Sequence, residues 1–399
     1  MILVGVLISG VAAWLLLPTA SDLWSLLRPA RRRASRQPNA SDRSPRLLIL
    51  VPAHDEELLL GDCLRSLTAM THPRDAVSVV VIADNCTDRT ADVARQAGVT
   101  CLERFDQSRT GKPHAIAWAL ERVDLDHHDA LVVVDADSRV DPSFASALAA
   151  RTPLRHKALQ PFNDVGNRSA SKMSAMAGVF STSRFLFMNR LKERAGLNVP
   201  LGNGLCVGSD ILRRHGWEAY SLSEDWEVYA LLTLRGIPIE NAPAAHICSQ
   251  EAVSLRQSST QRQRWSAGRI DVLRRVWRPL LGSRYVGAHQ KLDAIAELSN
   301  PGPAAHLGIA VVVAGVTLLL EPPGTTWLAG LVLSSVARPV VYTIAAICAE
   351  REPGRALLSF AFLPVYVLWR LGIQGASLVR SGEKRWIRTK RHEEISAAK

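Results

Sequence analysis

The most informative segment of the chain reads Leu131-Val132-Val133-Val134-Asp135-Ala136-Asp137. Four apolar residues in succession are typical of a strand buried on both faces, as the strands of parallel sheets are. Two carboxylates follow where such a strand releases the chain into a loop, and both can turn toward one divalent cation. Aspartates are also common in solvated turns and helix caps. The pair alone therefore predicts either a metal site or an ordinary turn.

Apolar runs alternate with helical patterns around this segment. The pattern predicts strands at residues 47–51, 77–83, 99–103 and 130–134, and helices at 56–70, 87–97 and 112–123. Such alternation indicates a parallel sheet covered by helices on both faces, an α/β nucleotide-binding fold. Ligands of these sheets bind at the carboxyl ends of the strands. Pro52, Glu56, Asp84 and Asp135 are expected at that edge.

Apolar segments flank this domain. The chain of 399 residues is 47% hydrophobic and 21% charged, a high apolar share for a purely soluble protein. Residues 2–17, 306–320, 327–349 and 356–379 are nearly free of charge. A membrane span needs about 20 apolar residues, with ~17 workable, so 327–349 is long enough, whereas 2–17 and 306–320 are marginal.

Two of these segments allow a second interpretation. Residues 2–17 could form the apolar core of a signal peptide, but they lack a basic start and a clear small-residue cleavage site. An uncleaved anchor is therefore favoured. Residues 356–379 contain Pro364, Trp369 and Arg370 and are basic at both ends. This pattern predicts a re-entrant or interface-lying helix, with a full span as the alternative.

Basic residues indicate the topology. Positive side chains stay on the cytosolic side, so the arginines at 28–36 predict a cytosolic domain after the first span, in a multi-pass protein of the cell (inner) membrane. The net charge of +11 comes largely from 28–36, 256–278 and the C-terminal tail, all beside apolar segments. This clustering favours membrane lipids over nucleic acid as the partner. The six cysteines show no paired spacing, so reduced thiols are expected.

Arg338 lies inside the apolar segment 327–349. A cation within a span costs about 2.5 to 3.5 kcal/mol on insertion scales, so such a residue is usually paired or functional. We expect it to contact a lipid phosphate or a cavity open to the cytosol.

Two motifs add candidate chemistry to the sheet edge. Lys112 follows Gly111 and precedes Pro113, a residue typical of the first helical position, so its charge and the free helix N–H groups can face a diphosphate. An ordinary surface lysine is the plainer alternative. Glu224 and Asp225 lie among aromatic residues and can face a sugar hydroxyl, although they also suit the acidic first turn of a helix.

Residues 255–278 are rich in arginine, and their apolar residues recur at steps of three and four until Pro279, which is expected to end the pattern. This predicts an amphipathic helix along the membrane face. It contains Gln261, Arg264 and Trp265. Arginine can clamp phosphate oxygens and an indole can stack on a sugar, but a basic interfacial helix with a tryptophan anchor remains the alternative.

In combination, these motifs resemble the family 2 glycosyltransferases, particularly the membrane-embedded branch of the cellulose and hyaluronan synthases and the ceramide glucosyltransferases. The resemblance covers residues 45–280 and the apolar segments. It implies a GT-A fold, which is Rossmann-like, together with transmembrane and interfacial helices. It also implies inverting transfer from a nucleotide-sugar donor, a UDP-sugar in the first instance, to a growing polysaccharide or a lipid. The implied cofactor is Mg²⁺ or Mn²⁺.

The same resemblance implies roles for individual residues. Asp225 and Glu224 match the catalytic pair, and Asp135 and Asp137 match the metal-binding Asp-x-Asp. The implied nucleotide-binding set is Pro52, Glu56, Asp84, Lys112, Asp135 and Arg264. The implied acceptor-binding set is Gly202, Asn203, Gly204, Gln261 and Trp265. His54 departs from the pattern, because asparagine is usual there. The apolar segments are also fewer than those with which cellulose synthases form a polymer channel.

The predicted organisation has six parts: an N-terminal transmembrane anchor at 1–27, a basic linker at 28–44, the cytosolic GT-A domain at 45–254, amphipathic interface helices at 255–303, membrane helices at 304–379 and a basic cytosolic tail at 380–399. Three other functions remain open, one of which is a nucleic-acid binder that would explain the basic charge, although no recognised basic-aromatic module is present. A nucleotidyltransferase would release pyrophosphate, and a catalytically silent scaffold of a polysaccharide system would transfer nothing.

Overall fold

The computed structural model describes residues 1–30 and 43–379, which form two compact units. Of these residues, the sheet unit comprises 43–166 and Asn198–Gln250, and the helical unit comprises Met1–Ala30, Asn167–Leu197 and 251–379. Most of the predicted basic linker and the whole predicted tail lie outside the described residues.

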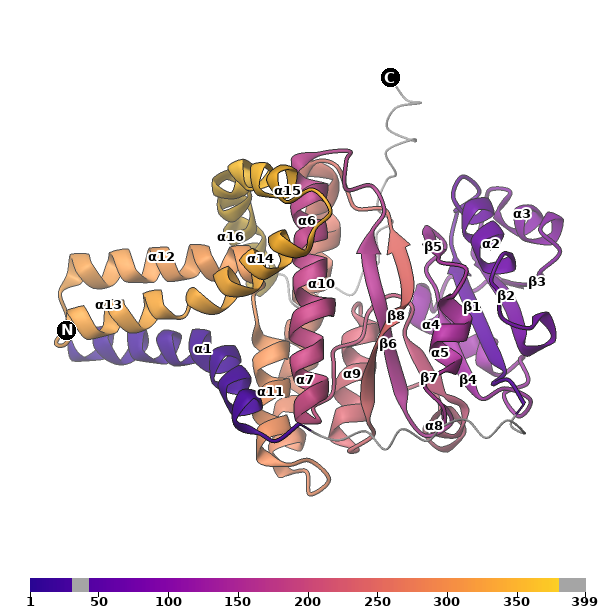
Figure 1. Cartoon of the computed structure of the whole chain (residues 1–399), viewed down its shortest axis with the longest axis horizontal. Coiled ribbons are helices and arrows are strands. Elements are labelled where there is room, and N and C mark those ends of the chain that lie inside the picture. The colour runs from indigo at the N-terminus through magenta and orange to yellow at the C-terminus, as the bar shows by residue number, and fades with distance from the viewer. Residues whose placement is uncertain (31–42, 380–399) are drawn as a thin grey trace. The chain divides into compact units, whose positions relative to one another are not determined.

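The sheet unit contains one eight-stranded sheet with the order β3-β2-β1-β4-β7-β6-β8-β5 (Figure 1). Its first half is parallel, because β1 pairs with both β2 and β4, and β2 pairs with β3. These strands are β1 (Leu47–Ala53), β2 (Val77–Asp84), β3 (Thr100–Arg104) and β4 (Ala130–Val133). The helices between them are α2 (Leu60–Thr68), α3 (Thr90–Gln96) and α4 (Lys112–Leu120). The predicted α/β order is therefore confirmed.

The second half of the sheet has mixed directions. Strand β7 runs antiparallel to β4 and β6, β6 runs parallel to β8, and β5 runs antiparallel to β8. These strands are β5 (Ser138–Val140), β6 (Ala158–Val165), β7 (Cys206–Gly208) and β8 (Ile239–Ser249). The helices of this half are α5 (Phe144–Ala149), α8 (Ser209–His215) and α9 (Glu224–Leu234).

The core explains why the parallel strands read as continuous apolar runs. Leu47, Ile49 and Val51 of β1 pack with the buried leucines of α2, while Leu48 and Leu50 on the opposite face are equally buried. Helix α4 lies against β1 and β2. Since both faces of β1 are covered, polar residues would be unfavourable on either side of the strand.

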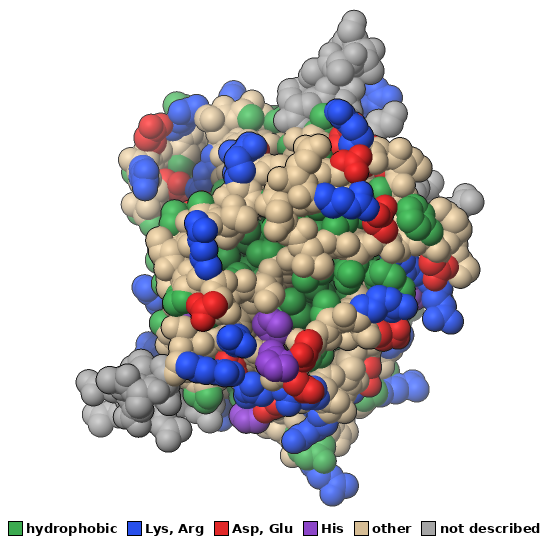
Figure 2. Space-filling model, turned by 90° about the vertical axis from the view of Figure 1, so that its right-hand side faces the viewer, with side chains coloured by type: hydrophobic (Ala, Val, Ile, Leu, Met, Phe, Trp, Pro, Cys, Tyr) green, Lys and Arg blue, Asp and Glu red, His purple; other side chains and the backbone are tan. Residues whose placement is uncertain are grey.

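Charged side chains of both signs lie interspersed on the surface shown in Figure 2. Some charged side chains form exposed ion pairs, such as Arg95 with Asp92 on α3 at 2.9 Å. Exposed pairs of this kind contribute about 0 to 1 kcal/mol each, so the fold depends on the apolar core rather than on them.

The helical unit consists of long helices, several of which are nearly free of charge. Helix α6 (Lys172–Thr182) continues through a π-helical turn, η2 (Ser183–Met188), into α7 (Asn189–Ala195). The other members are α1 (Ile2–Leu27), α10 (Leu255–Gly282), α11 (Ala288–Ser299), α12 (Pro303–Leu320), α13 (Thr325–Ser334), α14 (Ala337–Ala349), α15 (Pro353–Ser359) and α16 (Leu363–Val379). In Figure 1, α1, α12 and α13 lie side by side, and their apolar side chains form one buried cluster.

By length and composition, four segments of the described chain are able to cross a membrane. They are Ile2–Leu27, Pro303–Leu320, Thr325–Ala349 and Pro353–Ser377. The last of these is broken between α15 and α16 by a 3-10 turn at Phe360–Phe362. Whether it spans the membrane or lies at its surface stays a prediction.

The helix predicted at 255–278 is longer than expected. Helix α10 passes through Pro279 and ends at Gly282, so the expectation that Pro279 ends the helix is wrong. Proline removes one backbone donor and disfavours the helical conformation of the residue before it. Here the helix continues for only one further turn, in which Leu280 is buried.

Arg338 has a charged partner within the protein, as expected for a cation inside an apolar segment. Its Nε donates to Oδ2 of Asp22 at 2.7 Å, and its guanidinium lies 5.3 Å from the centre of the Tyr342 ring. Asp22 lies in the last turns of α1. An opposite charge thus compensates this buried cation. The contact with a lipid phosphate or with a cavity open to the cytosol stays a prediction.

A second buried charge cluster joins three helices of this unit. Lys192 of α7 forms ion pairs with Asp293 and Glu297 of α11, the latter at 3.2 Å. Ser21 of α1 donates to Oδ1 of Asp293 at 2.7 Å. All four side chains are buried. Because removing one member would leave uncompensated buried charge, this cluster fixes α1, α7 and α11 to one another.

Candidate active site

Side chains from three separate elements meet at one edge of the sheet. The Nζ of Lys112 donates to Oδ1 of Asp135 at 2.6 Å and lies 2.7 Å from Oε1 of Glu224. Lys112 opens α4, Asp135 follows the end of β4, and Glu224 opens α9. The predicted phosphate-facing lysine, metal-binding aspartate and catalytic glutamate thus share one polar centre.

The start of α4 aims Lys112 at this centre. Gly111 precedes the helix with φ 104°, a conformation that strongly favours glycine, and Pro113 occupies the first turn. The two carboxylates keep the ammonium charged. Burial alone would lower the pKa of Lys112, but Asp135 and Glu224 outweigh burial and raise that pKa above its ordinary value.

Asp135 and Asp137 follow the end of β4. Both are partly exposed, whereas Ala136 and Ser138 between and after them are buried. Ser138 donates to Oδ1 of Asp137 at 3.3 Å. Carboxylate oxygens are ligands that suit a hard divalent cation such as Mg²⁺ or Mn²⁺. The donor set therefore fits the implied cofactor.

The loop containing Gly202, Asn203 and Gly204 holds the aspartate turn in place. The Oδ1 of Asn203 accepts a hydrogen bond from the amide of Asp135 at 3.0 Å, and its Nδ2 donates to Ser138 at 2.7 Å and to Ser249 at 2.8 Å. Asn203 was predicted to bind the acceptor. The geometry gives this side chain a positioning function that the sequence did not reveal.

The glycines of this loop permit close approach. Gly204 has φ 78°, and a Cβ there would lie 3.2 Å from Ile247. A Cβ on Gly202 would lie 3.9 Å from Oδ2 of Asp225, so the loop passes beside that carboxylate. Gln160 fixes the loop by accepting a hydrogen bond from the amide of Gly202 at 2.7 Å.

Asp225 has the electrostatic character of a proton acceptor at neutral pH. Burial, reinforced by the neighbouring Glu224 carboxylate, raises the pKa of Asp225 to about 7, although Lys112 opposes the shift. Its Oδ1 accepts a hydrogen bond from the amide of Trp226 at 2.8 Å. A carboxylate with a pKa near the working pH is well suited to general base catalysis.

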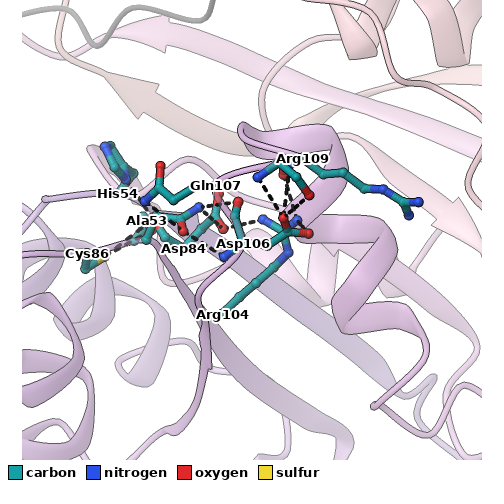
Figure 3. A network of polar contacts seen from close by, with 10 residues as sticks. Ala53, His54, Asp84, Cys86, Arg104, Asp106, Gln107 and Arg109 are labelled. Atoms are coloured by element: carbon teal, nitrogen blue, oxygen red, sulfur yellow. Dashed lines mark hydrogen bonds and ion pairs between the residues drawn. The ribbon is translucent and has the colours of Figure 1, made fainter.

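Asp84, predicted to contact the nucleoside, lies in the buried polar network shown in Figure 3. Its Oδ1 accepts hydrogen bonds from Arg104 at 2.6 Å and from Asn85 at 3.0 Å. Asp84 is 5% exposed and Arg104 is 3% exposed. Burial raises the pKa of Asp84, and the positive charge of Arg104 acts against this shift.

Arg104 is the residue of this network that the sequence interpretation missed. Besides Asp84, it donates to Oδ2 of Asp106 at 2.9 Å and to the carbonyl oxygen of Arg109 at 2.6 Å (Figure 3). It therefore shapes the loop that leads to Lys112. The available signal was its place at the end of the third predicted strand, where it is the direct neighbour of Asp84 in the parallel register.

His54 occupies the position where the family pattern has asparagine. Its Nδ1 lies 2.7 Å from the carbonyl oxygen of Asp84. Since a carbonyl oxygen can only accept, Nδ1 must carry the hydrogen, and the ring still ties the end of β1 to the end of β2. Nearby, Pro52 is part of β1, and the amide of Glu56 donates to Thr90 at 2.8 Å.

A second group of potential metal ligands follows β1 and β2. Donor atoms of Asp55, Cys86 and Asp88 lie within 4.8 Å of one another. However, Asp55 accepts from the amide of Thr87 at 2.7 Å, and Asp88 accepts from the amide of Glu57 at 3.0 Å. Burial also raises the pKa of the Cys86 thiol to about 11. Hydrogen bonds thus hold Asp55 and Asp88 in the turn, just as Lys112 holds Asp135. Both acidic groups remain candidates for the implied cation.

The remaining predicted residues lie on α10 of the helical unit. They are Gln261, Arg264 and Trp265. The side chain of Trp265 is 39% exposed, and the guanidinium of Arg262 lies 5.1 Å from the centre of its ring. Arg262 itself is paired with Glu251 at 2.7 Å. The roles predicted for the three residues stay predictions.

Known proteins resemble both the sequence and the fold. The chain is 24% identical over 239 residues to a probable glycosyltransferase of Bacillus subtilis, covering 56% of this chain and 55% of that protein. It is 25% identical over 269 residues to the beta-monoglucosyldiacylglycerol synthase of a Synechocystis species, covering 64% of this chain and 54% of that protein. The chain thus spans about half the length of these relatives.

Among solved structures, a mannosyltransferase of Pyrobaculum calidifontis in complex with GDP-Man and Mn²⁺ has the same fold. It matches with a TM-score of 0.59 and 17% identity over 95% of this chain and 97% of that chain. The family described as glycosyltransferase like family 2 matches residues 45–268. This match covers more than half of the chain, and the chain therefore belongs to glycosyltransferase family 2.

Proposed function

We propose that the protein is an inverting glycosyltransferase that moves a sugar from a nucleoside-diphosphate sugar to an acceptor at the membrane. The observation that carries the proposal is the convergence of Asp135 and Glu224 on Lys112, within 2.7 Å, at the carboxyl edge of a nucleotide-binding sheet. Family membership and four apolar helices of spanning length support it. A lipid is the favoured acceptor class, because one relative is named as a glycolipid synthase.

Asp225 is proposed as the general base. Its carboxylate takes the proton of the acceptor hydroxyl while that oxygen bonds to the anomeric carbon of the donor. The bond to the nucleoside diphosphate breaks at the same time, and the leaving group keeps the bonding electrons. One displacement inverts the anomeric centre. A pKa of about 7 leaves much of Asp225 ionised at neutral pH.

Asp135 and Asp137 are proposed to hold Mg²⁺ or Mn²⁺, and the cation would supply charge stabilisation for the departing diphosphate. Lys112 contributes a fixed positive charge next to Asp135. Pro52, Glu56 and Asp84 are proposed to face the nucleoside. Arg264 is proposed to clamp phosphate oxygens. The acceptor side is proposed to be lined by Gly202, Asn203, Gly204, Gln261 and Trp265.

The domain limits predicted from the sequence are proposed unchanged, with residues 45–254 as the catalytic domain in the cytosol. The charge distribution supports this placement, because the arginine-rich segments lie next to those ends of the apolar segments that the predicted topology puts on the cytosolic side of the membrane.

The test begins with purified membranes and a panel of nucleotide sugars with Mg²⁺ or Mn²⁺. Release of nucleoside diphosphate is followed, and the product is sized to separate single from repeated transfer. Chelation of the cation should stop release. Asp225→Asn should lower turnover by about 10² to 10⁴, with nucleotide binding largely kept. The control, Asp126→Asn, changes an exposed carboxylate that pairs with Arg213.

Two results would contradict the proposal. Turnover of the Asp225→Asn variant equal to that of the unmodified enzyme would remove Asp225 from the base role. Release of pyrophosphate instead of nucleoside diphosphate would identify a nucleotidyltransferase.

A further inference from the structure

Arg370 is a buried cation without a buried anion. It lies in the apolar helix α16 and is 9% exposed. Its Nη2 donates to the carbonyl oxygen of Pro301 at 3.2 Å, but Nη1 has no hydrogen-bond partner among residues 1–30 and 43–379. Within that described part of the chain, no carboxylate forms an ion pair with it, in contrast to Arg338, which has Asp22.

Most neighbouring groups of Arg370 increase the positive potential, although the Glu251 carboxylate, which is paired with Arg262, also acts on Arg370 electrostatically. A Cβ on Gly302 would lie 3.8 Å from Nη2 of Arg370, and Gly302 is the residue that precedes α12. The guanidinium thus lies at the N-terminus of an 18-residue helix, which carries a partial positive charge of roughly +0.5. Within the described structure, this helix start has no side-chain cap and no acidic residue in its first turn.

Free donors are available at the same place. Pro303 has no N–H group, and the amides of Ala304 and Ala305 have no acceptor within the helix because they belong to its first turn. Both alanines are buried. A further polar neighbour, Gln374, donates to the same Pro301 carbonyl at 2.9 Å, so it brings no negative charge. A guanidinium and a helix start without an intervening anion repel each other unless a bound anion separates them.

We propose that Arg370 and the N-terminus of α12 form a binding site for the phosphate group of a membrane lipid. A guanidinium and free helix amides are the donors that phosphate oxygens prefer. The position suits a lipid because α12 is a candidate span, and the start of a span lies at the level of the headgroups. This inference concerns binding only and does not depend on sugar transfer.

The test measures the thermal unfolding of the purified full chain in uncharged detergent micelles. Dioleoylphosphatidylglycerol is titrated in one arm, the phosphate-free lipid dioleoylglycerol in a second, and inorganic phosphate in a third. A ligand of the folded state raises the unfolding temperature with its concentration, which gives an apparent Kd. We expect stabilisation by the phospholipid and a smaller effect, or none, in the other two arms.

The Arg370→Gln variant should weaken the apparent Kd for the phospholipid about tenfold or more, since a charge-assisted hydrogen-bond pair is lost. The matched control is Arg355→Gln, which removes the same charge from an exposed side chain. It should bind as the unmodified chain does. Pro303→Glu provides a second variant, because it places a carboxylate at the exposed first position of α12. It should compete with the lipid and weaken binding in a chain that keeps Arg370.

Three outcomes would overturn the inference. The first is that Arg370→Gln and Pro303→Glu bind the phospholipid as tightly as the unmodified chain does. Arg355→Gln could lose as much affinity as Arg370→Gln, which would indicate diffuse attraction to anionic surfaces. Inorganic phosphate alone could give the full stabilisation, which would identify a soluble anion. If Arg370→Gln does not fold, Arg370→Lys decides, because it keeps the charge and loses the two-pronged geometry, and unchanged affinity would refute the site.

Discussion

Asp225 links the electrostatics of the site to a measurable pH profile. The proposed base works only when it is ionised, and burial together with Glu224 raises the pKa of Asp225 to about 7. Because the pKa is raised, protonation begins near neutral pH and removes the base as the pH falls. The value of kcat/KM should therefore decrease about tenfold per pH unit below about 7. Rates of nucleoside diphosphate release from pH 5 to 9 measure it.

A different pH profile would contradict the prediction for Asp225. A profile that stays flat from pH 6 to 8 would mean that another group accepts the proton, or that proton transfer does not limit the rate. Stability should be followed at each pH so that unfolding is not taken for titration.

Arg104 should affect donor binding more than chemistry. It holds Asp84 through a 2.6 Å hydrogen bond and also binds the loop before Lys112. Arg104→Lys keeps the charge but cannot reach Asp84, Asp106 and Arg109 at once. We expect the KM for the nucleotide sugar to rise about tenfold, with kcat changed much less. Steady-state kinetics over a range of donor concentrations measure both constants.

The control for this prediction is Arg122→Lys, in which an exposed arginine pairs with Glu121. A fall in kcat at unchanged donor KM would show that Arg104 acts on the reacting centre and not on nucleotide placement.

Individual residues differ in how well the sequence reveals them. Asp135 could be placed at the edge of the sheet because it follows a recognisable strand, whereas Lys112 and Glu224 were predicted only as residues near helix starts. Arg104 and the positioning bonds of Asn203 could not be predicted, since their importance lies in partners that are distant along the chain. A buried ion pair leaves no periodic pattern in a single sequence.

At the scale of elements, α12 and α16 approach each other closely at Gly308. A Cβ on Gly308 would lie 2.8 Å from Cγ1 of Val367 and 2.9 Å from Cδ1 of Leu371. Small residues of this kind let apolar helices pack tightly. Gly308→Ala should therefore lower the unfolding temperature, by an amount corresponding to about 1 to 3 kcal/mol of overpacking. Thermal unfolding in detergent measures it.

Gly315 of the same helix is the matched control, because a Cβ there would have no heavy atom within 4 Å. Gly315→Ala should leave the unfolding temperature unchanged or raise it slightly, as expected from the higher helix propensity of alanine. Equal effects of the two substitutions would show that the packing of α12 on α16 is not tight.

The elements also show which part of the fold a single sequence can predict. The parallel half of the sheet was predictable because β1, β2 and β4 are continuous apolar runs between helices. The mixed half was not. Strand β8 contains a proline, and its pairing with β6 shifts register between Pro161 and Phe162, so neither alternation nor length indicates a strand.

At the scale of the whole molecule, the chain combines a nucleotide-binding sheet with four apolar helices of spanning length. The charge rules predict that the sheet unit lies in the cytosol and that the short segment between α12 and α13 lies on the opposite side. The segment between these helices is Glu321 to Gly324, and it contains no basic residue. The predicted locations of the sheet unit and of the segment between α12 and α13 can be tested separately.

Two single cysteines report the topology, in a background in which the exposed Cys348 is serine. Asp126→Cys lies in the sheet unit, where the aspartate side chain is 79% exposed. It should react with a membrane-impermeant maleimide only after the cells are permeabilised. Thr325→Cys reports on the opposite side and should react with the maleimide in intact cells. Labelling of Asp126→Cys in intact cells would place the sheet unit outside the cytosol, where nucleotide sugars are scarce, and would exclude the proposed donor supply.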